Sequence, residues 1–461
     1  MTTTADYINA LSRDRVALIN SVHNITGHSH YNNTKFTTVI NTFENELPST
    51  VVDHYLEGPL FCGFSFGVGS GGLTLTTYAT PINLVEDTRA LANVSMFRNL
   101  ASMFRGASTL VDIDVSNWQT AKVTNMAYTF YQCSSLTTLN LNSWRTSQVT
   151  CMNDMFYNCK NLTSLNISKW QTNNLEYATY MFNNCTNLSL VSDQVLNLSS
   201  LKNGYCMFWS VKSLGGAINI NNLNLPNAFD IERMFSNIPT LTGLNLYYTN
   251  IHRAEECRSM FENCQNLTTL TYFNNMNTYN LVSCREMFNN CRNLSGSINV
   301  AFKHSENLLD ISYMFQNCIV LPTVYMKNIQ FADMVDWIQI YGTFNNCTNL
   351  TFANLYGWKC NYIYRISGMF NNCINLTQVD LTGWNLSNLY EAGGMFRYCN
   401  NLSTSALNNI ANAFSTAYYY NVKNMSNMNS YSPLYGTNKQ INSSTVGSTI
   451  LAKLTSNGWS V

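Results

Sequence analysis

The sequence predicts an α/β solenoid of about twelve repeated units, with a parallel β-sheet on one face and a cap at each end. Three observations support this fold class: a Phe recurs every 26 to 29 residues, a Leu follows each of these Phe residues six positions later, and apolar and polar residues alternate after that Leu. Such units cannot bury their apolar faces alone, so they must stack on one another.

The repeat is defined by a series of aligned residues. A Cys stands three residues after the Phe in nine units, and Ala, Val or Ile stands there in the others, which indicates a small buried site. The ladder Phe residues, from first to last, are Phe104, Phe130, Phe156, Phe182, Phe208, Phe235, Phe261, Phe288, Phe315, Phe344, Phe370 and Phe396.

Each unit is expected to hold one strand and one short helix. The alternation in Leu136–Leu141 is typical of a half-buried strand, and the apolar spacings of three and four in Met126–Cys133 predict a short helix. A period of about 26 residues with one LxxLxL strand lies in the leucine-rich-repeat range. Neighbouring strands would then lie about 4.8 Å apart.

The phrase M-F-x-N-C-x-N-L-T-x-L-N-L-x-x-W resembles the BspA-like leucine-rich repeats of bacterial and phage surface proteins. The resemblance covers residues 93–402, which we expect to form one continuous solenoid. In the family, the segment S-N-V-T-N-M leads into this phrase. Ala121–Met126 matches that segment, and Asn203–Met207 matches it poorly. The resemblance implies a non-enzymatic surface protein.

The ends of the chain differ from the repeats. Residues 1–58 are similar to an N-terminal module of phage tail and other virion proteins, which implies attachment to a particle through a helix carrying Tyr7, Leu11 and Leu18. Residues 59–92 are expected to form a β-rich N-terminal cap, and residues 403–461 a C-terminal cap of helix and strand, because exposed strand edges need covering.

Composition excludes several classes of protein. Net charge is zero and only 11% of residues are charged, which excludes a binder of nucleic acid that works through a basic surface. The 68 asparagines predict hydrogen-bonded ladders and uncharged polar surfaces instead. No apolar run is long enough for a membrane span. The N-terminus shows no leader pattern, so we expect synthesis in a bacterial cytoplasm.

The motifs that could carry chemistry have simpler interpretations. Gly67, Gly69 and Gly72 fit GxGxxG, but the following residues alternate like a strand, so a hairpin is favoured over a dinucleotide loop. Neighbouring ladder cysteines would be close enough for disulfides, yet a reducing cytosol favours buried free thiols. The cluster at His23, His28 and His30 is more typical of a surface loop than of a metal site.

No constellation of catalytic groups is visible, so we expect no enzyme activity, no metal and no cofactor. A Trp stands fourteen residues after the Phe in five units. This row could stack sugars, but a regular longitudinal row is more typical of core. Its members are Trp118, Trp144, Trp170, Trp358 and Trp384.

Outward positions of the predicted strands change along the chain. Early units carry small polar residues there, and later units carry aromatic ones, which are enriched at recognition surfaces. Scattered apolar exposure is the alternative, and it stays open. The candidate partner face comprises Tyr247, Phe273, Tyr325, Lys327, Phe352 and Tyr356.

These features predict a structural and recognition protein of a phage virion, either a tail or head fibre or a decoration protein. Its N-terminus would bind other virion proteins, and its repeats would bind a host surface glycan or protein. A bacterial cell-surface adhesin with the same repeats is the alternative. Assembly into a homo-oligomer stays open.

Overall fold

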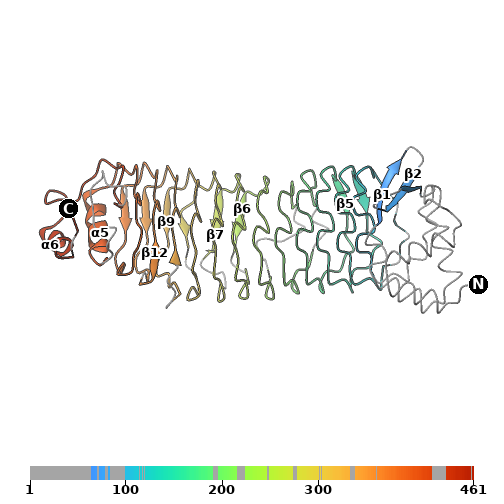
Figure 1. The fold of residues 1–461 in the computed structure, drawn as a ribbon, viewed down its shortest axis with the longest axis horizontal. Coiled ribbons are helices and arrows are strands. Elements are labelled where there is room, and N and C mark those ends of the chain that lie inside the picture. Colours follow the sequence, from blue (N-terminus) through green and yellow to red (C-terminus); the bar gives the residue numbers. More distant parts are fainter. Residues whose placement is uncertain are drawn as a thin grey trace, which may run out of the picture. The chain divides into compact units, whose positions relative to one another are not determined.

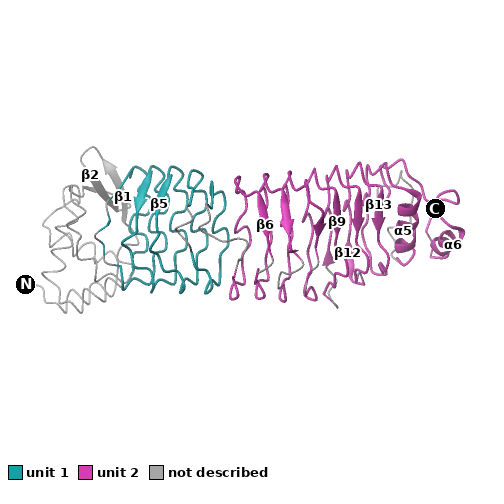
Figure 2. Cartoon of the chain, turned by 180° about the vertical axis from the view of Figure 1, so that it is seen from behind, with its two compact units in different colours: residues 1–218 teal, residues 219–461 magenta. Residues whose placement is uncertain are grey.

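A computed structural model gives the backbone of residues 64–69, 72–77 and 81–83. It describes in full residues 99–113, 115–116, 118, 120–190, 196–214, 224–246, 249–273, 278–300, 302, 304–332, 338–359, 361–417, 432–457 and 459–460. The predicted attachment residues Tyr7, Leu11 and Leu18 lie outside these ranges. The chain divides into two compact units, residues 1–218 and 219–461, and each is described by itself (Figure 2).

An antiparallel sheet precedes the repeats. Strand β1 (Phe64–Gly69) pairs with β2 (Gly72–Thr77), and β2 pairs with β3 (Pro81–Asn83). The register places Gly69 opposite Gly72, so the glycine-rich stretch connects two strands of a hairpin. The predicted hairpin is therefore confirmed, and a phosphate-binding loop that opens a helix is not formed there.

Parallel strands stack from one repeat to the next, as predicted (Figure 1). In the first unit, β4 (Thr138–Asn140) pairs with β5 (Ser164–Asn166). In the second unit, β6 (Gly243–Asn245) pairs with β7 (Thr269–Thr271). A four-stranded sheet then has the order β13-β11-β9-β8. Its strands are β8 (Ile298–Asn299), β9 (Thr323–Tyr325), β11 (Phe352–Asn354) and β13 (Gln378–Asp380).

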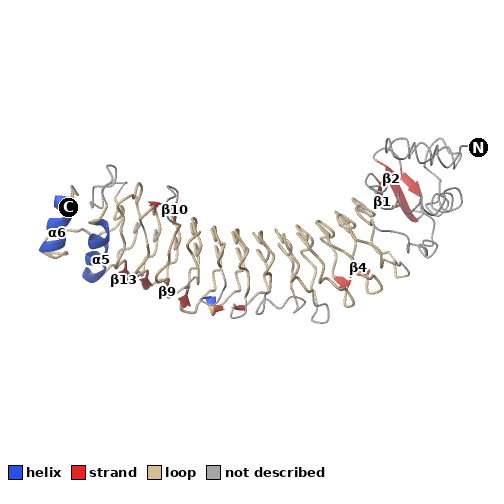
Figure 3. Ribbon diagram, turned by 90° about the horizontal axis from the view of Figure 1, so that it is seen from below, coloured by secondary structure: helices blue, strands red, loops and turns tan. Residues whose placement is uncertain are grey.

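A second parallel ladder runs along the segment that contains each ladder Phe. It consists mainly of single bridges at the residue five positions before the Phe, such as Asn125↔Cys151 and Asp230↔Glu256. It widens into strands only at β10 (Ile338–Gln339) and β12 (Ile363–Arg365), among the described residues. Figure 3 shows β10 on the other side of the coils from β9 and β13.

The predicted short helix at Met126–Cys133 is wrong: the residues form turns. Tyr128 and Gln132 have φ of 59° and 57°, so the backbone leaves the right-handed helical region twice within this segment. Alternate N–H groups then donate in two directions. Phe130 N donates to Met155 O of the next repeat at 2.8 Å, while Cys133 N donates to Phe130 O at 3.1 Å. Apolar spacing cannot distinguish this turn from a helix.

Asparagine is favoured in this turn because it tolerates the left-handed conformation. The residue two positions after the ladder Phe has positive φ and is Asn in eight repeats. Its side chain also bonds to its counterpart in the neighbouring repeat, as in Asn184 Nδ2 to Asn158 Oδ1 at 2.8 Å and Asn372 to Asn346 at 2.7 Å. The predicted asparagine ladders are confirmed.

The core lies between the two parallel ladders and is built from stacked identical residues. Successive Phe rings within each unit lie 5.1 to 5.8 Å apart, as in Phe104–Phe130 and Phe315–Phe344. The Leu that follows is also buried, as at Leu136 and Leu162. Burial of these apolar rows is the main term that holds the coils together.

The nine ladder cysteines are buried and free, so the interpretation as small buried thiols is confirmed. Each thiol also donates to the carbonyl of the ladder Phe in the preceding repeat, for example Cys159 Sγ to Phe130 O at 3.1 Å and Cys373 Sγ to Phe344 O at 3.1 Å. This contact explains why Cys is preferred over Ala, which could not donate.

The Trp row is buried, so its interpretation as core is confirmed. Trp118 stacks on Trp144 at 5.8 Å, and Trp358 on Trp384 at 5.2 Å. Apart from that of Trp118, the indole N–H groups bond to carbonyls of the preceding repeat, as in Trp170 Nε1 to Leu141 O at 3.1 Å. These rings therefore offer no face to a sugar.

Two helices end the second unit. Helix α5 (Thr404–Phe414) begins at the N-cap Ser403 and packs against β13, and α6 (Ser448–Ser456) packs against α5. The last Phe turn donates to residues that follow α5: Gly394 N to Ser432 O at 2.8 Å, and Phe396 N to Pro433 O at 2.8 Å. The final coil thus finds acceptors without a further repeat.

Candidate ligand-binding surfaces

Two surfaces of the coils present side chains in register. We call the surface on the side of β4–β9, β11 and β13 the strand face. We call the surface formed from five residues before each ladder Phe to one residue after it the Phe-turn face. In both, the backbone repeats from coil to coil, so side chains at one register position form a row.

The strand face gathers four of the predicted ligand residues on β9, β11 and the loops that follow them. Tyr325 lies edge-on to Phe352, with ring centroids 5.7 Å apart, and Lys327 Nζ lies 5.9 Å from the centre of the Tyr325 ring. Tyr356 is 47% exposed, and Lys327 is also exposed. We call Tyr325, Lys327, Phe352 and Tyr356 the strand patch.

The prediction that Phe273 points outward is wrong. Its side chain is buried and packs edge-on against Phe288 and Phe302, at 6.0 and 5.4 Å. Strand β7 ends at Thr271, and Tyr272 has a φ of 56°, so the alternation of the strand is broken before Phe273. Tyr272 is the exposed aromatic residue here, at 53%. Tyr247 lies outside the described residues.

The Phe-turn face carries a series of ion pairs in the second unit that sequence reasoning missed. Arg285 Nε lies 3.2 Å from Glu286 Oε1, and its Nη1 lies 3.8 Å from Asp310 Oδ2. Arg233 and Arg258 both approach Glu232, at 3.4 and 3.9 Å. These residues are far apart in sequence, and only alignment on the ladder Phe reveals that they share one surface.

Burial raises the pKa of three acids on this face. Desolvation raises the pKa of Asp154 to about 6, against the opposing effects of a hydrogen bond with Tyr128 and the nearby Arg105. Desolvation also raises the pKa of Glu256 and of Asp310. Half-buried carboxyl groups in a row can be functional or structural. Glu256 is hydrogen-bonded to the Ser283 side chain and Asp310 to Ser312.

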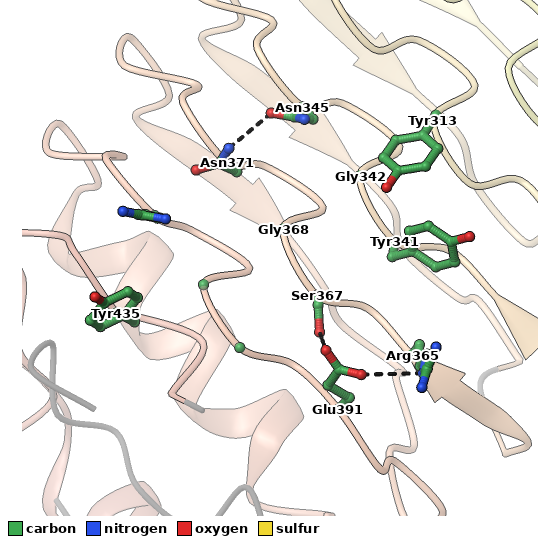
Figure 4. A pocket seen from close by; sticks show the side chains of 13 residues that line it. Tyr313, Tyr341, Gly342, Asn345, Arg365, Ser367, Gly368, Asn371, Glu391 and Tyr435 are labelled. Atoms are coloured by element: carbon green, nitrogen blue, oxygen red, sulfur yellow. Dashed lines mark hydrogen bonds and ion pairs between the residues drawn. The ribbon is translucent and has the colours of Figure 1, made fainter. Parts of the chain in front are cut away.

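A groove of about 440 Å³ opens on the Phe-turn face of the last coils (Figure 4). Figure 4 shows side chains surrounding Gly368, with Tyr313 and Tyr341 at one end and Tyr435 at the other. Asn371 Nδ2 donates to Asn345 Oδ1 at 3.0 Å along one side. Along the other side Glu391 accepts from Ser367 Oγ at 2.9 Å and pairs with Arg365 Nε at 3.2 Å. We call this the glycine groove.

The described residues contain neither a metal-binding cluster nor a membrane-spanning helix. Across the residues that the structure describes, no three His, Cys, Asp or Glu side chains gather where they could hold a metal ion. The cluster of His23, His28 and His30 lies outside those residues. Within the described ranges, no helix has the length and apolar character needed to cross a bilayer.

Comparison with protein families settles the relationship of the chain. Residues 85–195, 202–328 and 310–449 match the family described as "Mycoplasma protein of unknown function, DUF285". The chain belongs to the DUF285 family. No curated protein matches this DUF285 chain.

Solved structures with leucine-rich repeats are similar to this DUF285 protein. A leucine-rich repeat protein from Bacteroides ovatus is 17% identical, with 61% of this chain and 75% of that chain covered and a TM-score of 0.26. A leucine rich cell surface protein from Faecalibacterium prausnitzii is 16% identical, with 73% and 86% covered and a TM-score of 0.36. The parallel strand ladders themselves confirm the predicted solenoid.

The glycine groove is not visible in the apolar pattern of the DUF285 repeat. The glycine groove is assembled from Gly342, Gly368 and Gly394, which stand in three consecutive coils at the position two residues before the ladder Phe. The signal that could have found it is the loss of a side chain at one register position in the last three repeats. Hydrophobic periodicity ignores that position because it is not in the core.

Proposed function

We propose that this protein is a non-enzymatic recognition protein that binds the surface of a bacterial cell through its repeats. The observation that carries the proposal is the strand patch. Four predicted ligand residues, scattered over 32 positions from 325 to 356, lie on adjacent coils, with the Tyr325 and Phe352 rings in contact and Lys327 over the Tyr325 ring.

A fixed backbone supports binding at this patch. Tyr325 and Phe352 stand on strands paired in register, with Tyr325 opposite Asn354 and Phe352 opposite Thr323. Side chains held in this way lose little freedom when they bind a ligand, which lowers the cost of association. Tyr side chains combine apolar area with a polar tip, and Phe352 adds apolar area, so a patch of this kind suits a glycan or a protein loop.

For the location, we propose a phage virion, with residues 1–58 attaching the protein to other virion proteins. This rests on the resemblance of those residues to N-terminal modules of virion proteins. A bacterial cell-surface adhesin is the second candidate. It is favoured by membership of a family described from Mycoplasma.

Adsorption to bacteria tests the role of the patch. The variant Tyr325→Ser/Tyr356→Ser should fold normally and bind bacterial cells at least about tenfold more weakly, because losing contacts worth about 1.4 kcal/mol produces that factor. The matched control is Tyr272→Ser/Tyr279→Ser, which removes two tyrosines that are 53% and 58% exposed outside the patch. Equal adsorption of both variants and the wild type would remove the support for this function.

Location needs a separate experiment. An antibody against the chain should detect it in purified phage particles and not in the envelope fraction of uninfected cells. Deletion of residues 1–58 should leave the folded chain in the lysate but absent from particles. Detection in envelopes of uninfected cells would favour the adhesin instead.

A further inference from the structure

The glycine groove is open because three residues lack side chains where most coils have one. Gly342, Gly368 and Gly394 have φ of 63°, 61° and 61°. The left-handed backbone alone does not require glycine here, because Tyr313 and Glu286 adopt φ of 58° at the same register position. Some other constraint must favour glycine in the last coils.

Packing explains only the first of these glycines. A Cβ on Gly342 would lie 2.3 Å from the Tyr313 ring, so a side chain is excluded there. A Cβ on Gly368 would lie no closer than 3.7 Å to any neighbour, and one on Gly394 no closer than 3.5 Å, which are ordinary contact distances. At these two positions glycine leaves space that a side chain could have occupied.

The charges around this space are unequal. Two guanidinium groups, Arg365 and Arg397, and one carboxylate, Glu391, line the groove, so its lining carries a net charge of +1. Glu391 is already engaged by Arg365 and by Ser367.

Arg397 is the groove cation that does not pair with Glu391. It bonds to Tyr398 Oη at 2.9 Å, and its guanidinium carbon lies 4.8 and 5.3 Å from the ring centres of Tyr398 and Tyr435. Within the part of the chain that the structure describes, it has no carboxylate partner. A guanidinium beside a groove and without an acid is suited to a carboxylate on a ligand.

The rest of the lining indicates a ligand rich in hydroxyl groups. Its thirteen residues are Tyr, Gly, Asn, Ser, Arg and Glu, and none is Ala, Val, Leu, Ile, Met or Phe. Amide and hydroxyl groups such as those of Asn345 and Ser367 both donate and accept hydrogen bonds. Tyr rings line the two ends of the groove; Arg285 lies over Tyr313 and Tyr341, and Arg397 over Tyr435, so a sugar ring would pack against the parts of these rings that the guanidinium groups leave open. The hydrogen-bonding groups along both sides of the groove favour a polar ligand over an apolar one.

We propose that the glycine groove binds a carboxylate-bearing sugar, with Arg397 holding the carboxylate and the glycine floor admitting the ring. A volume of about 440 Å³ is within the range of small-ligand sites, about 300–1,000 Å³. The groove is a second site, on the Phe-turn face, and it does not depend on the strand patch.

Isothermal calorimetry on the full chain tests the proposed sugar site. The ligands are trigalacturonic acid and its uncharged analogue, the fully methyl-esterified trimer. The acid should bind at least about tenfold more tightly than the ester, because a hydrogen bond to a charged group is worth about that factor. Inorganic phosphate at equal concentration should not displace the acid. Equal binding of acid and ester, no binding of either, or displacement by phosphate would overturn the proposal.

Two variants locate the site. Arg397→Gln should weaken binding of the acid by about tenfold. Arg105→Gln is its matched control, because Arg105 also follows its ladder Phe directly and also lies over two Tyr rings, at 5.2 and 5.1 Å, outside the groove. Unchanged binding by Arg397→Gln, or an equal loss in the control, would contradict the assignment.

The second variant fills the space. Gly368→Tyr places in the groove a residue that Tyr313 shows to be compatible with this backbone, and it should abolish binding. Gly296→Tyr is the control, since a Cβ there meets nothing within 4 Å and the residue lies outside the groove. Circular dichroism verifies folding of each variant. Binding by folded Gly368→Tyr would overturn the proposal, and Tyr325→Ser/Tyr356→Ser should bind the trimer normally.

Discussion

The Phe-turn faces of the two units share a backbone and differ in chemistry. In the first unit the face is a row of aromatic rings: Tyr131 stacks on Tyr157 at 4.9 Å, and Tyr180 meets Tyr205 edge-on at 5.1 Å. In the second unit this face carries ion pairs and then glycines, with the ring pair Tyr313–Tyr341 between them. The core rows and backbone bonds are alike in both. The repeat therefore fixes the backbone and leaves this face free to vary.

The largest effect should come from the part that the units share. Phe156→Ala in the first unit and Phe288→Ala in the second should each lower the free energy of unfolding by about 3–5 kcal/mol, because both side chains are fully buried in the ladder. Urea denaturation followed by circular dichroism measures this. A cost below about 1 kcal/mol in one unit would mean that the two ladders are not equivalent.

A smaller effect is expected for the left-handed asparagines. Asn290 has a φ of 63° and donates to Asn263 Oδ1 at 2.6 Å. Asn290→Ala should cost about 1–2 kcal/mol from backbone strain and the lost bond. Asn290→Gly should cost less, since glycine adopts this conformation freely. If the Gly variant is the less stable of the two, the conformational explanation is wrong.

The stability of the first unit should depend on pH through Asp154. Because burial raises the pKa of Asp154 from 3.8 to about 6, the folded state favours the protonated acid. Its ionisation therefore destabilises the fold above about pH 6 and has no effect below pH 3.8. Asp154→Asn should raise the melting temperature at pH 7.5 but not at pH 3.5. A benefit that is equal at both values would contradict this assignment.

The smallest effect should come from the ion pairs of the second unit. Arg285 and Glu286 are partly exposed, so a double-mutant cycle with Arg285→Gln and Glu286→Gln should give about 0.2–1 kcal/mol. At about 1 M salt, where the screening length is about 3 Å, the coupling should fall toward zero. A coupling that resists salt would show that the row is more than a solvated surface.

The sequence alone predicts the features that recur in every coil. The Phe, Leu, Cys and Trp rows and the central strand residue, such as Leu139, follow from one period and from the burial of apolar groups. Backbone conformation inside the Phe turn is not predicted, because positive φ at Tyr128 or Tyr272 leaves no mark in the apolar pattern. The wrong orientation predicted for Phe273 has the same cause.

The candidate ligand surfaces were predicted in part for a related reason. Tyr325 and Tyr356 could be found because outward strand positions follow from simple alternation. The glycine groove could not be found in this way, because it depends on side chains that are missing at one repeat position. Space at Gly368 becomes visible only when three coils are superimposed and the neighbouring atoms are known.

The hydrogen bonds that end the ladder have a consequence for how chains of this kind can change in length. Within each unit, internal coils donate to the next coil from equivalent positions of the Phe turn, and the last coil of the second unit donates to Ser432 and Pro433 instead. A duplicated unit of about 26 residues, inserted at a coil boundary, would find donors on one side and acceptors on the other without any compensating change. Each such insertion would carry surfaces on either side of it about 4.8 Å further apart. The distance between surfaces on different coils can therefore change in discrete steps, through the number of repeats that the gene encodes.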